Sequence, residues 1–314
     1  MRLIGRIVRP FGYDIRKRDT INLLPFKPLV SDNSLQRVRL NINGNYSNPA
    51  KTHPRLDVIK IVFRTCLSPE RLSKSGVRIE NLPIVDIVER CFISLVNSIN
   101  YIVDVSDIDV KLIIMDDRSD KELFEKITEH GRKLRCRWST IETDRPGQGA
   151  SLRQQFKMAT DDDAIFYFCE DGFIHEEVAI YEMWRFYNRI YELSGQHLVI
   201  HPQEHENLYK ESYGPCYLFL SDFRHWRSVS DATHVIFTHS FVVKKYWRYF
   251  KNTKYVGEYN KRRLGSERRT TNRLFRHLPC FAPIPALAGH LQATHLLPPF
   301  FDWRALWNES APDR

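Results

Sequence analysis

Two patterns of apolar and polar residues alternate along the central part of the chain, one typical of buried strands and one typical of amphipathic helices. Short apolar runs, rich in β-branched and aromatic residues, predict buried strands at 57–64, 110–115, 137–142 and 164–169. Between these runs, apolar residues recur at three- and four-residue spacing, most regularly from Ile84 to Ile99, and predict amphipathic helices. Strands that alternate with helices indicate an α/β fold over residues 55–180, a doubly wound, mostly parallel sheet with helices on both faces.

Beyond residue 176 the pattern changes. We expect a long amphipathic helix at 177–192 and a strand at 197–200, after which the apolar spacing becomes irregular. We also expect Ser119 to cap the helix that follows the second strand, because Glu122 stands three residues further on and completes a capping box.

Two of the predicted strands end in adjacent carboxylates. The second strand is followed by Asp116 and Asp117, and the fourth by Glu170 and Asp171. Buried carboxylates are costly unless a cation or hydrogen-bond donors meet them, and ligands of open α/β sheets bind at the carboxyl ends of the strands. Mg²⁺ and Mn²⁺ prefer carboxylate oxygens and share their coordination with substrate phosphate. The two acidic ends therefore predict a site for a metal ion and a nucleotide diphosphate.

A glycine-containing loop adds to this prediction. Gly147-Gln148-Gly149 leads into a predicted helix at 152–159 and could let the backbone approach a phosphate closely. We take Gly149 and Arg153, with Arg64 at the end of the first strand, as further candidates for binding the donor nucleotide. The loop by itself is equally compatible with an ordinary connection before a helix.

The positive charge of the 314-residue chain lies in two stretches. The net charge is +9, of which residues 1–18 carry +5 and residues 244–276 carry +10, so the rest of the chain carries −6. Two basic patches on an acidic body indicate local anionic partners, such as a lipid surface or a phosphorylated substrate, rather than a protein that coats nucleic acid.

The sequence has no apolar run near the ~20 residues of a membrane span. Its six cysteines are far apart and lack metal-ligand spacing, so we expect a reducing, cytoplasmic compartment. Residues 1–18 place Leu3, Ile4, Ile7 and Val8 at helical spacing among basic residues. This pattern is compatible with peripheral contact with a membrane, and equally with a disordered or packed arm.

In sequence these strand ends resemble glycosyltransferases of the A-type (GT-A) fold, close to the large family 2 of inverting enzymes. In that family the second strand ends in D-D-x-S-x-D, which here is the segment from Asp116 to Asp120. More narrowly, the chain resembles bacterial glycosyltransferases with an E-D-D-Y-L-H motif, which here reads E-D-G-F-I-H from Glu170 to His175, with Gly172 in place of the third acid. Later motifs of the group extend the resemblance over about residues 57–304; they lie at 224–227, 282–290 and 301–303.

The resemblance implies the roles of the acidic strand ends. The enzyme would transfer a sugar from a nucleotide-diphosphate sugar to a glycan or lipid-linked acceptor, with inversion. Asp117, with Asp116 beside it, would hold the uracil or ribose end of the donor. Asp171, assisted by Glu170 and by the late His290, would coordinate a divalent metal, Mn²⁺ or Mg²⁺, that offsets charge on the departing diphosphate.

The resemblance also implies a catalytic carboxylate in the second half of the chain. An inverting transfer needs a base for the proton of the acceptor hydroxyl, and Glu267 is the first candidate, ahead of Asp231. We expect a helix to continue from Glu267 to Leu278, so the alternative for Glu267 is a helix-start residue that the helix dipole stabilises. His225 and Trp226 are candidates for binding the acceptor, with core packing as the alternative.

On this interpretation residues 1–54 form a basic arm and lead-in, 55–185 the nucleotide-sugar-binding half, and 186–314 the acceptor-binding and catalytic half of one domain. Other functions stay open. Sugar nucleotidyltransferases usually carry a glycine-rich, basic loop directly after the first strand, whereas Thr65–Pro69 has neither glycine nor a basic residue. Gly172 favours a degenerate GT-A protein that binds without catalysis. Nucleic-acid binding is favoured only by the basic isoelectric point.

Overall fold

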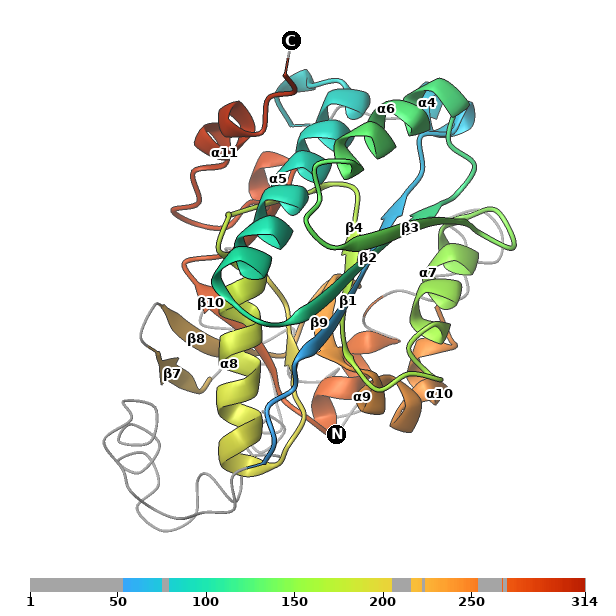
Figure 1. The fold of residues 1–314 in the computed structure, drawn as a ribbon. Coiled ribbons are helices and arrows are strands. Elements are labelled where there is room, and N and C mark those ends of the chain that lie inside the picture. The colour runs from blue at the N-terminus through green and yellow to red at the C-terminus, as the bar shows by residue number, and fades with distance from the viewer. Residues whose placement is uncertain are drawn as a thin grey trace, which may run out of the picture.

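The computed structural model describes residues 53–74, 79–204, 216–221, 224–253, 267 and 270–313. The basic segment 1–18 and most of the lead-in to residue 54, for which we predicted a role as an arm, lie outside the described residues. A nine-stranded sheet in the order β3-β2-β1-β4-β9-β6-β10-β8-β7 forms the centre of the molecule (Figure 1).

The first half of the sheet matches the predicted strands to within one residue. The strands are β1 (Val58–Thr65), β2 (Asp109–Asp116), β3 (Arg137–Glu142) and β4 (Ile165–Glu170). They pair in parallel, β3 with β2, β2 with β1 and β1 with β4. The carboxyl ends of all four strands therefore lie at one edge, as the alternation of strands and helices predicted.

The second half contributes one strand that was predicted, within 197–200, and four strands that the sequence pattern did not predict. Beside β4 lie the antiparallel β9 (Ile236–His239), then β6 (Val199–Ile200), β10 (Cys280–Ile284), β8 (His225–Val229) and β7 (Leu218–Leu220). We expected an irregular region here, because strands of two to five residues are too short to show a period. Only β8 and β9 run against the other seven strands, so the expected mostly parallel architecture is confirmed.

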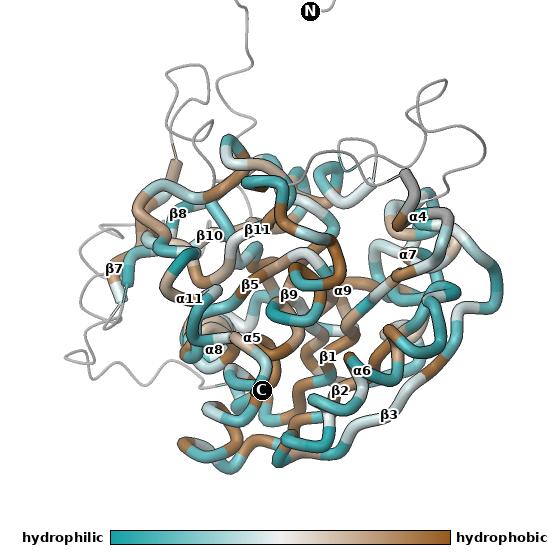
Figure 2. The backbone as a smooth tube through the Cα atoms, turned by 90° about the horizontal axis from the view of Figure 1, so that it is seen from above, coloured by the Kyte–Doolittle hydropathy of each residue, from teal (hydrophilic) through white to brown (hydrophobic). Residues whose placement is uncertain are grey.

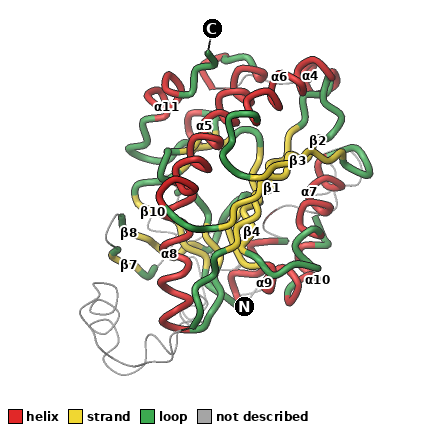
Figure 3. Tube along the Cα trace, viewed as in Figure 1, coloured by secondary structure: helices red, strands yellow, loops and turns green. Residues whose placement is uncertain are grey.

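Helices cover both faces of the sheet (Figure 3). One face packs against α5 (Ile84–Val105), α6 (Lys121–Gly131) and α8 (Ala179–Ser194). The other packs against α7 (Gln148–Lys157), α9 (Ser240–Lys245), α10 (Trp247–Phe250) and the 3₁₀ helix η8 (Thr271–Arg276). Neighbouring residues of β1 alternate between these layers, which explains the unbroken apolar runs of the strands and their hydrophobic colour at the centre of Figure 2.

A small antiparallel pair lies outside the main sheet. β5 (Phe173–His175) pairs with β11 (Ala288–His290), and this register sets Phe173 opposite His290. The C-terminal helix α11 (Trp303–Glu309) packs against this pair and α5 in a third apolar cluster. The remaining short helices are α4 (Pro69–Lys74), η4 (Ile79–Asn81) and η9 (Thr294–Leu296). None of the described helices is long and apolar enough to cross a membrane.

Two local expectations, the cap of α6 and the start of α7, were wrong, and the helix expected after Glu267 is of the 3₁₀ type. Helix α6 is capped by Asp120, whose carboxylate accepts from two backbone N–H groups of the first turn, because the Ser119 hydroxyl instead accepts from Leu67 N at 2.6 Å. The helix expected after Glu267 is present as the 3₁₀ helix η8, from Thr271 to Arg276. Helix α7 begins at Gln148, four residues earlier than predicted, directly after Gly147, whose φ of 102° favours glycine.

Candidate functional site

The carboxyl edge of the sheet brings the two acidic strand ends together around the end of β1. In the register of the parallel strands, Arg64 lies opposite Glu170 of β4, and Thr65 lies opposite Asp116 of β2. The two acidic strand ends thus flank the end of β1, one on each side, although they are far apart in the sequence.

Asp171 is a buried carboxylate that receives hydrogen bonds on both oxygens. Its Oδ2 accepts from Cys66 N at 3.0 Å, from the Thr65 hydroxyl at 3.2 Å and from Arg71 Nη1 at 2.5 Å, while its Oδ1 accepts from Arg71 Nη2 at 3.0 Å. Burial alone would raise the pKa of Asp171, but the bidentate Arg71 contact holds it below its ordinary value. Asp171 is therefore ionised and already paired.

The turn after β1 explains how Arg71 reaches this carboxylate. The Ser68 hydroxyl accepts from Arg71 N at 3.3 Å, and Pro69 occupies the first position of α4, where its fixed φ and missing N–H suit a helix start. The short helix directs the Arg71 side chain back to the strand end, where it also donates to Cys66 O at 2.6 Å. A cation from the short helix that follows the first strand thus enters the site.

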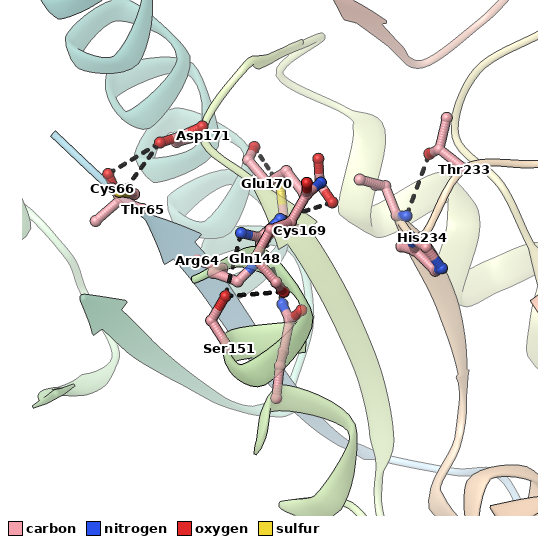
Figure 4. Close-up of polar contacts among 12 residues, drawn as sticks. Arg64, Thr65, Cys66, Gln148, Ser151, Cys169, Glu170, Asp171, Thr233 and His234 are labelled. Atoms are coloured by element: carbon pink, nitrogen blue, oxygen red, sulfur yellow. Dashed lines mark hydrogen bonds and ion pairs between the residues drawn. The ribbon is translucent and has the colours of Figure 1, made fainter. Parts of the chain in front are cut away.

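A second arginine–carboxylate pair lies beside the first. Arg64 Nη2 is 2.8 Å from Glu170 Oε1, and its Nη1 donates to the Ser151 hydroxyl of α7 at 3.4 Å (Figure 4). The buried Arg64 Nε has no hydrogen-bond partner among the described residues. Burial would raise the pKa of Glu170, yet the charge of the Arg64 guanidinium keeps it below its ordinary value. This pair links the ends of β1 and β4 to the first turns of α7.

The carboxylates at the end of β2 organise the neighbouring loops. Asp117 accepts from Gly147 N at 3.1 Å with both oxygens and from the Thr143 hydroxyl at 3.2 Å. It thereby fixes the start of α7. Asp116 accepts from Ser119 N at 3.1 and 3.2 Å, and burial raises its pKa, an effect that these hydrogen bonds only partly offset. Both residues lie where we expected the nucleoside end of a donor.

Gly172, which replaces the third acid of the motif, leaves space that His290 occupies. A Cβ atom at position 172 would lie 3.0 Å from His290 Cδ2 and 3.1 Å from its Nε2. The imidazole stacks on Phe173 with ring centroids 4.6 Å apart, and His290 N donates to Gln203 Oε1 at 2.9 Å. His290 therefore stands next to the acidic end of β4, and a side chain at position 172 would press against its ring.

Glu267 is held by a buried histidine. Its Oε1 lies 3.3 Å from His234 Nδ1, while His234 Nε2 is 3.0 Å from the Thr270 hydroxyl. Burial lowers the pKa of His234, although Glu267 and Glu170 act to raise it, so the ring is neutral near pH 7. A neutral ring carries one N–H; with that proton on Nδ1, the ring presents it to Glu267 and leaves Nε2 to accept from the Thr270 hydroxyl.

The remaining predicted site residues lie elsewhere or serve the fold. The prediction that Trp226 binds the acceptor was wrong. Its side chain is only 1% exposed and stacks on Phe186 with ring centroids 4.2 Å apart, so it offers no face to an acceptor. His225, one residue earlier, is exposed. Asp231 is exposed and accepts from Asn272. Within α7, Gly149 is buried in the first turn and Arg153 is exposed.

Arg224 lies in the segment 224–227, which resembles a motif of the glycosyltransferase group, and it has a structural role here. Its guanidinium donates to Glu176 at 2.8 Å and to Glu182, and to the carbonyl oxygen of Pro285 at 2.8 Å. It therefore ties the start of α8 to the turn that precedes β11, and this turn leads to His290.

As placed, the predicted metal ligands do not fit a divalent cation. Both oxygens of Asp171 accept from Arg71, and Glu170 is paired with Arg64. Within the described ranges, no three His, Cys, Asp or Glu side chains group closely enough to hold a metal ion. A cation would first have to displace Arg71, so the Mn²⁺ or Mg²⁺ site stays a prediction from the resemblance.

The sequence analysis missed Arg71, Ser151 and His234. Arg71 follows a Ser-Pro helix start, a signal that predicts the turn but not the direction of the side chain. Ser151 lies two residues after Gly149, in the first turns of α7, where the predicted helix had not yet begun. His234 sits among short strands without a periodic pattern, so nothing in the sequence marks it.

Comparison with known proteins gives distant structural likeness only. No family model and no curated protein matches the chain. Among solved structures, S. aureus TarS 1–349 is similar with 12% identity and a TM-score of 0.37, over 60% of this chain and 48% of that one. The same fragment in complex with UDP-GlcNAc has 9% identity and a TM-score of 0.36, over 76% and 56%. A UDP-glucose pyrophosphorylase complexed with UDP-glucose has 12% identity and a TM-score of 0.41, over 72% and 90%. The chain spans about half of the TarS fragment.

Proposed function

We propose that this protein is a transferase that binds a nucleoside-diphosphate sugar at the carboxyl edge of β1, β2 and β4 and passes the sugar to a glycan or lipid-linked acceptor. The observation that carries the proposal is the convergence of two arginine–carboxylate pairs with the first turns of α7 at that edge. Such an arrangement lies where ligands of α/β sheets bind.

Each part of the site suits one part of such a donor. Guanidinium groups recognise phosphate oxygens through paired hydrogen bonds, and the leading amides of α7 have no acceptor within the helix and favour an anion. Asp116 and Asp117 lie one strand further along the edge, at a suitable place for ribose hydroxyls or base N–H groups. The diphosphate would then lie over the ends of β1 and β4, between Arg71 and Arg64.

Glu267 is the candidate base for an inverting transfer. The acceptor oxygen would attack the anomeric carbon while the bond from that carbon to the diphosphate oxygen breaks. The acceptor proton passes to the Glu267 carboxylate, and the nucleoside diphosphate leaves with the bonding electrons. His234 would hold Glu267 in position through its Nδ1–H, and the side chain of Glu267 keeps 38% exposure for an acceptor.

A sugar nucleotidyltransferase is the second candidate, and Arg71 favours it. The loop directly after β1 contains no basic residue, but α4 returns a guanidinium to the strand end. A cation from this region is the feature that nucleotidyltransferases are expected to have. The two reactions differ in their products, since a nucleotidyltransferase releases pyrophosphate from a nucleoside triphosphate and a sugar 1-phosphate.

Calorimetric titration of UDP and GDP tests the proposed site, each with and without Mn²⁺. Binding of either nucleotide, weakened by Asp117→Ala, supports a donor site. Release of UDP or GDP from its sugar conjugates then supports the glycosyltransferase, and release of pyrophosphate supports the second candidate. Binding without either release indicates a degenerate binding protein. A folded protein that binds neither nucleotide contradicts the proposal for UDP- and GDP-sugars.

A further inference from the structure

We infer that Arg71 and Arg64 supply the positive charge that binds the donor diphosphate, so that this protein binds its nucleotide without a divalent cation. The inference rests on the proposed function and concerns the same edge of the sheet. It follows from the contacts of the two carboxylates, which the resemblance had assigned to a metal.

The charges at the site already balance. A divalent cation held by two carboxylates has a net charge of zero. Glu170 and Asp171 here face two guanidinium groups, and this cluster also has a net charge of zero. The two arginines thus carry the same positive charge that a metal would bring to a diphosphate, and they carry it on groups that form directed hydrogen bonds to phosphate oxygens.

Arg71 keeps donors for a ligand. Its guanidinium has five N–H groups, and its hydrogen bonds to Asp171 and Cys66 use three of them. About a quarter of the side chain is exposed, against 9% for Asp171. One side of Arg71 is therefore fixed by the carboxylate while another stays accessible, and a fixed orientation lowers the entropic cost of binding an anion.

A metal would meet two obstacles at this place. It would have to take Asp171 from a bidentate, buried arginine, whose charge would then lie unpaired next to the cation. The third acid of the motif is absent as well, because the His290 imidazole fills the space beside Gly172, 3.0 Å from where a Cβ would stand. The two carboxylates that remain, Glu170 and Asp171, are each paired with an arginine.

The alternative is that the Arg71–Asp171 pair only fastens α4 to the end of β4. That structural role and nucleotide binding respond differently to the same variants. Removing the charge of Asp171 weakens a structural pair and destroys a metal ligand, but it leaves the positive charge of Arg71 for a diphosphate. Removing Arg71 eliminates that charge.

The test is calorimetric titration of UDP and of GDP into the full chain, in EDTA and in Mn²⁺. The variants are Arg71→Met, Arg71→Lys and Asp171→Asn. Arg137→Met is the matched control, because Arg137 forms a similar two-contact pair with Asp109, exposed and at the opposite edge of the sheet. Circular dichroism and melting temperatures establish that each variant is folded.

We expect the wild type to bind one of the nucleotides in EDTA within about threefold of its affinity in Mn²⁺. Since hydrogen bonds to charged groups contribute about 1.5–3 kcal/mol, Arg71→Met should weaken binding in EDTA by about 10- to 100-fold. Arg71→Lys should bind with an affinity between those of the wild type and Arg71→Met, because it keeps the charge and loses the paired donors. Asp171→Asn and Arg137→Met should bind within about threefold of wild type.

Binding that requires Mn²⁺ and disappears in Asp171→Asn overturns this inference and leaves the proposed function standing. Unchanged binding by folded Arg71→Met also overturns it, because that variant lacks the positive charge of Arg71. If neither nucleotide binds under either condition, the proposed function fails for these two donors and the inference fails with it. The comparison of EDTA with Mn²⁺ uses the wild type alone, so it decides the metal question even if Arg71→Met does not fold.

Discussion

Replacing Glu170 by alanine should destabilise the protein strongly, because it leaves the charge of Arg64 buried without its partner. The Arg64 side chain is 9% exposed and that of Glu170 is 19% exposed. Loss of one partner from a buried ion pair costs about 3–5 kcal/mol. The residual exposure of Glu170 lets water reach the guanidinium in the variant, so we expect a loss of about 2–4 kcal/mol in the free energy of unfolding.

Urea denaturation, followed by circular dichroism and tryptophan fluorescence, measures this loss for Glu170→Ala, Arg64→Met and the double variant. The double variant contains neither charge, so it should be more stable than Glu170→Ala alone. Asp109→Ala provides the control, because its partner Arg137 is 75% exposed, and exposed pairs contribute at most about 1 kcal/mol.

Two results would refute this reasoning. One is a loss in Glu170→Ala no larger than the loss in Asp109→Ala, which would mean that the Arg64 charge is solvated without Glu170. The other is a double variant whose loss equals the sum of the two single losses, because a pair that interacts cannot give additive effects.

Three further predictions concern His175, Gly172 and His234. Burial lowers the pKa of His175 from 6.5 to about 3. The unfolded chain thus binds a proton that the folded protein does not, and the free energy of unfolding should fall below pH 6.5 by up to about 1.4 kcal/mol per pH unit; urea denaturation from pH 7 to pH 4 should show a smaller slope for His175→Gln, and an equal slope would contradict the assignment. Gly172→Asp should lower stability by about 1–3 kcal/mol, because its Cβ would lie 3.0 Å from the His290 ring, which must then shift to make room for the larger side chain; thermal melts should show a smaller loss for Gly172→Ala, which adds the contact without the charge, and wild-type stability in both would refute the tight fit. His234→Phe should lower kcat by about 10- to 100-fold at an unchanged KM for the donor if it positions Glu267 as the base; steady-state kinetics beside Glu267→Gln test this, and an altered KM with an intact kcat would count against the role.

The first half of the fold follows from the sequence because its strands are long and buried on both faces. The apolar runs of β1, β2 and β4 and the helical spacing of α5 are strong periodic signals. Strands β6 to β10 have two to five residues each, so their place in the sheet comes from tertiary pairing. The cap of α6 was misassigned because Ser119 bonds to Leu67, a contact that depends on the approach of two loops.

The position of the candidate site could be predicted from the sequence, but the contacts between its side chains could not. Acidic residues at two strand ends indicated the correct edge of the sheet, since parallel strands end together. The partners of Asp171 and Glu170 could not be read from the sequence, because Arg71 lies 100 residues from Asp171 and the direction of a side chain depends on the folded turn. Trp226 failed as an acceptor residue because aromatic residues serve cores as readily as binding surfaces.

Hydrogen–deuterium exchange with and without UDP or GDP tests the central claim most directly, because it locates the nucleotide on the sheet. Binding should slow exchange in peptides that cover residues 65–72, 116–120 and 147–152, which contain the ends of β1 and β2 and the start of α7. Peptides from β7 and β8 should exchange as before. Protection confined to other parts of the chain, at nucleotide concentrations that saturate binding, would contradict a donor site at the carboxyl edge of β1, β2 and β4.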